Sequence, residues 1–210
     1  MPSTLVHVAI GGLVGAALLT SEFDARAVAV VVAVTAVPDV DAFAGLLLPG
    51  AHRSLFHSLL FPTIVGLLLL GDTVRADSLL RTRFGDRGVR LAWVSLAAMV
   101  LGGILPDLFT NGVNAFYPVV DAFYTVDGEL LLSDQRGLVQ TFVELQPPEQ
   151  SKPQPSTKTV HYSTPVDPSP GNEPKDVERV APVFQAGWEL MVVVVSTVVV
   201  SYRLWESRRR

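Results

Sequence analysis

The chain has 210 residues, of which 49% are hydrophobic and only 17% are charged, whereas soluble domains carry about 25% charged residues. The mean hydropathy of +0.40 and the gathering of apolar residues into long segments indicate a membrane protein. A net charge of −4 gives no reason to expect a nucleic-acid partner, and the lack of cysteine excludes disulfides and thiolate chemistry.

The first two apolar segments each contain a feature that is unusual for a membrane span. Residues 5–19 are apolar except for His7, and could also be the core of a signal peptide, although no basic residue precedes them. Residues 27–37 form the second segment and are followed by Pro38. Proline weakens a helix because it lacks an N–H and its ring clashes with the preceding turn. Apolar residues then resume as far as Leu48.

Three more apolar segments follow, so we predict about five transmembrane helices. Residues 55–71 form the third, and His57 is expected in the first turns of its helix. Residues 91–105 form the fourth, which ends at Pro106-Asp107. Residues 183–202 form the fifth, which contains Glu189 and is bracketed by Trp188 and Trp205, residues typical of membrane interfaces.

The chain between the fourth and fifth segments has a different character. Residues 111–124 are aromatic-rich and are expected at the membrane interface, and residues 129–132 and 138–145 flank a turn and predict a short β-hairpin. Residues 146–182 are rich in Pro, Ser, Lys and Glu and predict a mobile linker.

The predicted fold class is therefore an all-α integral membrane protein with a small hairpin insertion between its fourth and fifth helices. We expect a four-helix membrane domain over residues 1–124 and a polar extracytoplasmic loop over residues 125–181. Residues 182–210 are expected to form the fifth helix and a basic tail. A homodimer is possible through the small residues of the segment Gly11-Gly12-Leu13-Val14-Gly15.

Arginine predicts the orientation of the helices in the plasma membrane. Cytoplasmic loops carry an excess of Lys and Arg. Five arginines lie between the third and fourth segments, and three end the chain: Arg75, Arg81, Arg83, Arg87, Arg90, Arg208, Arg209 and Arg210. Both regions are therefore expected in the cytoplasm, which puts the N-terminus and the long acidic loop outside.

This topology brings six potential metal ligands to the outer membrane face. They are His7, Asp39, Asp41, His52, His57 and Asp107. Ionisable groups at membrane depth are costly unless they are paired or coordinated. Imidazole and carboxylate together suit zinc, and also iron or manganese. Arg53 lies beside them in the sequence and could hold a phosphate or carboxylate through two parallel hydrogen bonds.

Each residue also has a simpler interpretation. A lone His in an apolar helix is more often a packing residue, and Pro-Asp at a helix end is commonly a stop followed by a capped turn. Asp39 and Asp41 are the stronger signal, because two acids two residues apart repel each other unless something positive binds. A weak internal repeat, in which His7 corresponds to His57 and Pro38-Asp39 to Pro106-Asp107, predicts two hairpins that each supply one His and one Asp.

The segment His52-Arg53-Ser54-Leu55-Phe56-His57-Ser58 follows Pro38-Asp39-Val40-Asp41, and together with His7 and Asp107 it resembles the YdjM-like family. These proteins are described as LexA-binding, inner-membrane-associated, metal-dependent hydrolases. The resemblance covers about residues 1–120 and implies that the six residues above are metal ligands. The family is distantly similar to zinc-dependent phospholipase C and related nucleases, which implies hydrolysis of a phosphoester.

The chain departs from the family pattern at one position. The family typically has a His four residues before the last Asp, and here that position is Gly103. The site could hold fewer metals, recruit Asn111 or Asn114, or be inactive.

Three functions remain open from the sequence. The first is a membrane hydrolase in which Asp39, His57 and Arg53 are catalytic, a divalent metal, with zinc expected, activates water, and the substrate is a phosphoester that could be lipid-linked. The second is a non-catalytic scaffold with a structural or degenerate metal site, whose outer loop recruits a partner. The third is an ion-coupled transporter using Asp39 and Asp107, for which the cytoplasmic halves of the helices offer almost no polar residues.

Overall fold

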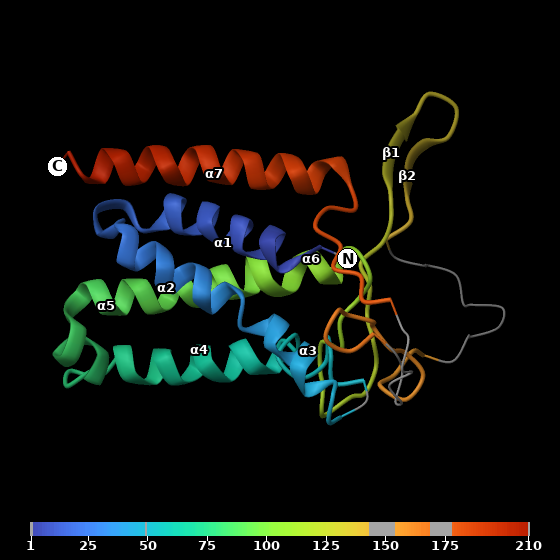
Figure 1. The fold of residues 1–210 in the computed structure, drawn as a ribbon, viewed down its shortest axis with the longest axis horizontal. Coiled ribbons are helices and arrows are strands. Elements are labelled where there is room, and N and C mark those ends of the chain that lie inside the picture. The colour runs from blue at the N-terminus through green and yellow to red at the C-terminus, as the bar shows by residue number, and fades with distance from the viewer. Residues whose placement is uncertain (1, 49, 143–153, 169–177, 210) are drawn as a thin grey trace.

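The computed structural model describes residues 2–48, 50–142, 154–168 and 178–209. Five helices of eleven or more residues lie side by side within these ranges (Figure 1). They are α1 (Thr4–Leu18), α2 (Ala25–Thr35), α4 (Leu60–Thr73), α5 (Leu79–Ala98) and α7 (Gly187–Ser207). The elements between them are short: η1 (Thr20–Glu22), η2 (Pro38–Val40), α3 (Asp41–Ala44), η3 (Met99–Ile104), α6 (Leu105–Leu108), β1 (Leu130–Ser133) and β2 (Gly137–Gln140).

Two helices in the described residues are long and apolar enough to cross a membrane. One is the stretch Leu79–Leu108, which comprises α5, η3 and α6, and the other is α7. A third candidate is α2 followed by Pro38–Ala44, with a bend of 46° between them. Helices α1 and α4 are apolar but have only 15 and 14 residues, or roughly 21–22 Å at 1.5 Å per residue, against about 30 Å of hydrocarbon. The prediction of five spans is not confirmed.

The two ends of the bundle differ in chemistry. The C-terminus and the α4–α5 connection lie at one end, and the N-terminus, the hairpin and residues 154–168 lie at the other (Figure 1). At the C-terminal end, Arg87 pairs with Asp24, and Nη1 of Arg90 lies 3.3 Å from Oε2 of Glu22. Both basic segments therefore share one end of the bundle, as the sequence predicts. Their cytoplasmic location stays a prediction.

Small residues let α1, α2 and η3 approach closely. A Cβ atom on Gly11 would lie 2.2 Å from Oγ1 of Thr35, and one on Gly102 would lie 2.9 Å from the backbone nitrogen of Gly11. Gly12 faces Ser196 of α7, whose hydroxyl donates to the carbonyl of Ala9 at 2.7 Å. The glycines that we expected at a dimer interface are therefore used inside the chain, and dimerisation itself stays a prediction.

Helix boundaries differ from the expected ones near the polar residues. Helix α4 begins at Leu60, so His57 lies before the helix rather than in its first turns. Helix α5 begins at Leu79, well before the apolar segment, and is broken at Gly85, whose φ of +70° is not helical. Residues 79–90 include four arginines, and apart from Gly85 they are still helical, because helical hydrogen bonding does not require an apolar side chain.

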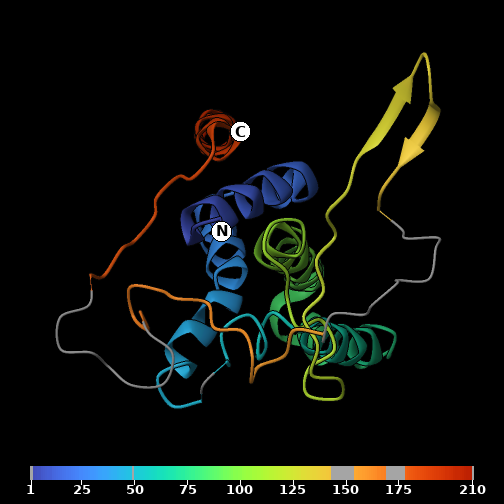
Figure 2. The ribbon, with the colours of Figure 1, turned by 90° about the vertical axis from the view of Figure 1, so that its right-hand side faces the viewer.

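The predicted hairpin is confirmed. Strands β1 and β2 pair in antiparallel register, with Leu131 opposite Val139, and the hairpin projects away from the bundle (Figure 2). The second strand ends at Gln140, and residues 143–145 of the predicted strand lie outside the described residues. Of the predicted linker, residues 154–168 and 178–182 are described, while residues 146–153 and 169–177 lie outside the described ranges.

Candidate metal centre

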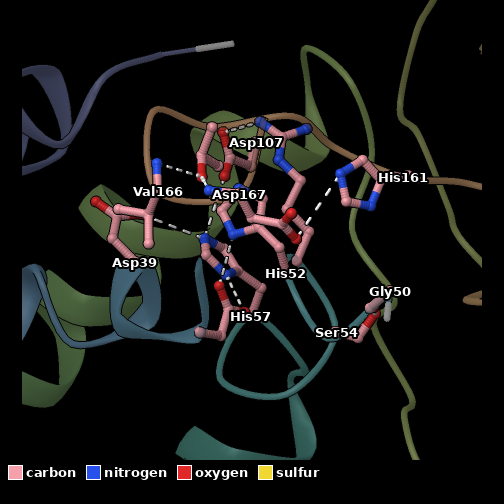
Figure 3. A network of polar contacts seen from close by, with 12 residues as sticks. Asp39, Gly50, His52, Ser54, His57, Asp107, His161, Val166 and Asp167 are labelled. Carbon is pink, nitrogen blue, oxygen red and sulfur yellow. Dashed lines mark hydrogen bonds and ion pairs between the residues drawn. The ribbon is translucent and has the colours of Figure 1, made fainter. Parts of the chain in front are cut away.

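Five segments of the chain bring all the predicted site residues together at the N-terminal end of the bundle. Figure 3 shows Asp39, His52, His57 and Asp107 side by side. His7 comes from α1, Asp39 from η2, Asp41 from α3 and Asp107 from α6, while His52, Arg53 and His57 come from residues 50–59. Pro38 ends α2 and turns the chain by 46°, so that Asp39 and Asp41 follow directly after the bend. The cluster is buried, and Asp39 has the most exposed side chain among its ion-paired members, at 15%.

Asp41 holds two imidazole rings at once. Its Oδ1 lies 2.8 Å from Nδ1 of His52, and its Oδ2 lies 2.8 Å from Nδ1 of His57. An ionised carboxylate only accepts hydrogen bonds, so both Nδ1 atoms donate. The opposite nitrogen, Nε2, is buried without a hydrogen-bond partner in both residues. This arrangement fixes each ring so that its Nε2 points away from Asp41.

The other imidazole nitrogens and carboxylates converge on one region. Nε2 of His57 lies 3.1 Å from Oδ2 of Asp107 and 3.6 Å from Oδ1 of Asp39. Nε2 of His7 lies 3.6 Å from Oδ1 of Asp107, and Nδ1 of His7 lies 3.2 Å from both oxygens of Asp39. The two predicted hairpins therefore do meet, because His7 with Asp39 and His57 with Asp107 occupy the same site.

Arg53 is the basic member of the cluster, and it is fully buried. Its Nη2 donates to Oδ1 of Asp107 at 2.6 Å, and its Nη1 donates to the carbonyl of Gly112 at 3.1 Å. Its φ of +62° lies in the left-handed region, which residues other than glycine adopt when surrounding contacts hold them there. The structure therefore gives Arg53 a partner within the cluster, and its role in holding a substrate anion stays a prediction.

The cluster carries excess negative charge. Asp39, Asp41 and Asp107 supply three carboxylates, and Arg53 supplies the only permanent positive charge among the predicted site residues. Neutral imidazoles therefore leave two negative charges to be balanced. Buried charges are stable only when they are paired or coordinated. Either protonated imidazoles or a divalent cation would supply that balance.

Tyr162 is a residue of this site that the sequence did not identify. Its ring lies over the guanidinium of Arg53, with 4.6 Å from Cζ to the ring centroid, and its centroid lies 6.4 Å from that of His52. Its hydroxyl donates to the carbonyl of Asn111 at 2.7 Å. The one possible signal was a lone aromatic residue within a polar segment. His161 beside it lies 3.8 Å from Asp167 and forms no ion pair with the cluster.

Asp121 is one of the attachments of residues 154–168 to the rest of the chain, beside the hydrogen bonds that join Gln154 and Pro155 to the backbone of Phe123. Its carboxylate accepts from the backbone N–H of Thr157 at 2.9 Å, from the hydroxyl of Thr157 at 2.7 Å and from Nδ2 of Asn114 at 2.7 Å. Desolvation tends to raise the pKa of Asp121, but these hydrogen bonds outweigh it and hold the pKa below the ordinary value of an aspartate. Asn114 is thereby occupied away from the cluster.

The structure accounts for Gly103, where the family pattern has a His. A Cβ atom at this position would lie 2.5 Å from the carbonyl oxygen of Thr35 and 3.1 Å from Cγ of Pro38. The residue lies in the π-helical turn η3, one turn before Asp107. The missing imidazole therefore leaves no open space, because α2 and η2 pack directly against the glycine.

In the described part of the chain, no group of three or more His, Asp or Glu side chains has the geometry of a metal site. No curated protein and no solved structure matches the chain. One family model does match, over residues 1–206, and it extends past the residues that carry the resemblance to include residues 125–181 and nearly all of α7. The chain therefore belongs to the YdjM inner membrane protein family.

Proposed function

We propose that this protein is a membrane-bound metal-dependent hydrolase that acts on a phosphoester, which could be lipid-linked, at the outer face of the membrane. The observation that carries the proposal is the convergence of His7, His57, Asp39 and Asp107 from four separate segments. Nε2 of His7, Nε2 of His57 and Oδ2 of Asp107 are all buried and lack hydrogen bonds. Buried polar atoms are normally hydrogen-bonded, so three such atoms that lie close together in ion pairs but lack hydrogen bonds suggest a shared partner.

The separations within the cluster support a divalent cation. Two ligand atoms that are each 2.0–2.1 Å from a tetrahedral zinc ion lie roughly 3.3 Å from one another. The nitrogen–oxygen distances of 3.1, 3.6 and 3.6 Å around His57 and His7 are close to that value. A divalent cation would also balance the two excess negative charges. Small adjustments of these side chains would therefore turn direct contacts into shared coordination.

The roles of the residues follow from their contacts. His7, His57, Asp39 and Asp107 would hold the metal, and Asp41 would orient His57 and His52, as carboxylates do behind metal-bound imidazoles. A bound metal lowers the pKa of a water ligand and polarises a phosphoryl oxygen. Arg53 holds the carboxylate of Asp107, and we infer that its charge would also attract the phosphate of a substrate. The unpaired Nε2 of His52 could join the ligands or accept a proton.

Metal content is the first test. We expect stoichiometric divalent metal in detergent-purified wild-type protein and its loss in His57→Ala. His161→Ala is the matched control, because that imidazole forms no ion pair with the cluster. Metal-loaded protein should hydrolyse a phosphodiester such as bis(p-nitrophenyl) phosphate, and Asp39→Ala should abolish turnover. Wild-type protein without metal, or turnover unchanged in Asp39→Ala, would contradict the proposal.

A structural metal site in a non-catalytic scaffold is the second candidate. The close packing at Gly103 favours it, since this chain has no space for the additional imidazole of the family pattern. On this hypothesis, metal raises the melting temperature of the protein, while a broad panel of phosphoesters shows no turnover. Turnover that is lost in His57→Ala would rule it out.

A further inference from the structure

A cavity of about 500 Å³ lies directly beside the candidate metal centre. The N-terminal residues, α3, residues 163–166 and residues 181–183 form its walls. Most of the lining is apolar and includes Leu5, Ala42, Phe43, Pro165 and Val166. Its size falls within the range of small-molecule binding pockets. Asp39 and His52 are its two lining residues from the metal centre.

This cavity provides a way into a centre that is otherwise closed. The side chains of His7, Asp41, Arg53, His57 and Asp107 are all fully buried. Asp39, at 15% exposure, and His52, at 6%, are the exceptions among the predicted site residues, and both line the cavity. A substrate that reaches the centre through this cavity therefore leaves its remaining atoms against the apolar walls.

The chain next to the cavity is apolar and exposed. Phe43 lines the cavity and is 58% exposed, and Leu46, Leu47 and Leu48 after it are 50%, 85% and 58% exposed. A continuous run of large apolar side chains on the surface marks a site of contact with a membrane or another apolar partner. If this run faces the lipid, an apolar chain would pass along it into the cavity.

We propose that this cavity binds the apolar chain of an amphipathic phosphoester, with the phosphate placed at Asp39 and His52. The reaction at that phosphate rests on the proposed function, whereas binding of the chain does not. The lining supports the assignment, because Asp39 and His52 connect the cavity to the metal centre and most of the other lining residues are apolar. The substrate class is therefore a lipid-like phosphoester, and a small soluble phosphate ester would use only the polar side.

A second apolar groove provides a control. It has a volume of about 520 Å³, lies between α4 and α5, and is lined by residues that include Pro62, Trp93 and Ala97. None of its lining residues belongs to the metal centre. Non-specific partition of a lipid into apolar surface should therefore occur equally at this groove.

The test uses the full-length, zinc-loaded protein in detergent and a long-chain alkylphosphonate that carries a diazirine at the end of its chain. A phosphonate is not hydrolysed, so its binding is measured independently of turnover. We expect cross-links to Ala42, Phe43 and residues 163–166, and weak binding of a short-chain phosphonate. Ala42→Phe should lower the affinity by roughly tenfold or more, because each buried methylene contributes roughly a factor of four. Ala97→Phe should leave the affinity unchanged.

Val166→Trp fills the cavity from its other wall and gives a second variant if Ala42→Phe does not fold. Cross-links that fall mainly on the α4–α5 groove would overturn the proposal. It would also be overturned if Ala42→Phe and Ala97→Phe had equal effects, or if the short-chain phosphonate bound as tightly as the long one. Chain-dependent binding without hydrolysis of any phosphoester would leave the cavity assignment standing and refute the proposed function instead.

Discussion

Arg53 and Asp107 form a completely buried ion pair, with Nη2 2.6 Å from Oδ1, although they are 54 residues apart in the sequence. The pair joins residues 50–59 to the end of the helix Leu79–Leu108. It also holds one oxygen of Asp107 while the other faces His57 at 3.1 Å. The geometry of the candidate metal centre therefore depends on this guanidinium.

Arg53→Met should destabilise the protein strongly. Removing one partner of a buried pair leaves the other charge uncompensated and typically costs about 3–5 kcal/mol. Arg87→Met is the matched control, because it breaks the exposed pair with Asp24, in which the side chains are 51% and 41% exposed. Exposed pairs contribute about 0–1 kcal/mol. Thermal unfolding in detergent measures the loss of stability in both variants. Equal losses would contradict the prediction that the Arg53–Asp107 pair is buried and the more important of the two.

Gly103→Ala should destabilise the bundle, although it adds only one methyl group. Its Cβ atom would lie 2.5 Å from the carbonyl of Thr35, and overpacking of this kind costs about 1–3 kcal/mol. A Cβ atom on Gly71 of α4 meets nothing within 4 Å, so Gly71→Ala should be neutral or stabilise by up to about 1 kcal/mol. Gly103→His, which restores the family residue, should not increase metal content. If Gly103→Ala left the free energy of unfolding unchanged, α2 and η3 would have to lie farther apart than they do in this structure.

Asp41→Asn should weaken metal binding without removing a ligand. Asp41 accepts hydrogen bonds from both His52 and His57, and loss of such an outer contact typically lowers metal affinity by about 10–100-fold. Zinc titration against a competing chelator measures the effect. Asp134→Asn, in the exposed hairpin turn, provides the control for the loss of one carboxylate. An unchanged affinity in Asp41→Asn would mean that this carboxylate does not orient the imidazoles.

Residues 154–168 should loosen in acid. The pKa of Asp121 is lowered in the folded chain, because hydrogen bonds from Thr157 and Asn114 outweigh the opposing effect of desolvation. The contribution of Asp121 to stability is therefore complete above its ordinary pKa of about 3.9 and is lost as the pH falls through the lowered value. The substitution Lys158→Cys introduces the only cysteine of the chain. A spin label attached there should gain mobility below about pH 4.

Adding Asp121→Asn to that spin-labelled chain provides the control. The amide cannot titrate and accepts fewer hydrogen bonds, so the label should be mobile at every pH. A label whose mobility follows the same pH curve with either residue would show that another group releases the segment.

The predicted orientation can be tested directly, because the chain has no cysteine of its own. Asp134→Cys in the hairpin should react with a membrane-impermeant maleimide on intact cells. Asp77→Cys, between α4 and α5, and Ser207→Cys, at the end of α7, should react only after permeabilisation. Reaction of all three residues from outside, or the reverse pattern, would refute an outward N-terminus.

Local chemistry explains which features could be predicted. The apolar segments, the break at Pro38 and the hairpin over residues 130–140 depend on hydropathy, a missing N–H and turn residues, all of which are properties of neighbouring residues. The helix boundaries were harder to predict, since α5 begins at Leu79, well before the apolar segment 91–105, and α4 begins only after His57. Those boundaries depend on packing and on where the chain must turn.

The sequence by itself determined that polar residues of α1, η2, α3, the segment 50–59 and α6 would share one end of an apolar bundle, because a membrane leaves few places for them. Only the tertiary structure decided how they meet. It placed Asp41 between two imidazoles, Arg53 on Asp107 and Tyr162 over Arg53. It also filled the space at Gly103 with α2 and η2. Such contacts join residues far apart in the chain, so they depend on how the helices pack and not on the pattern of any one segment.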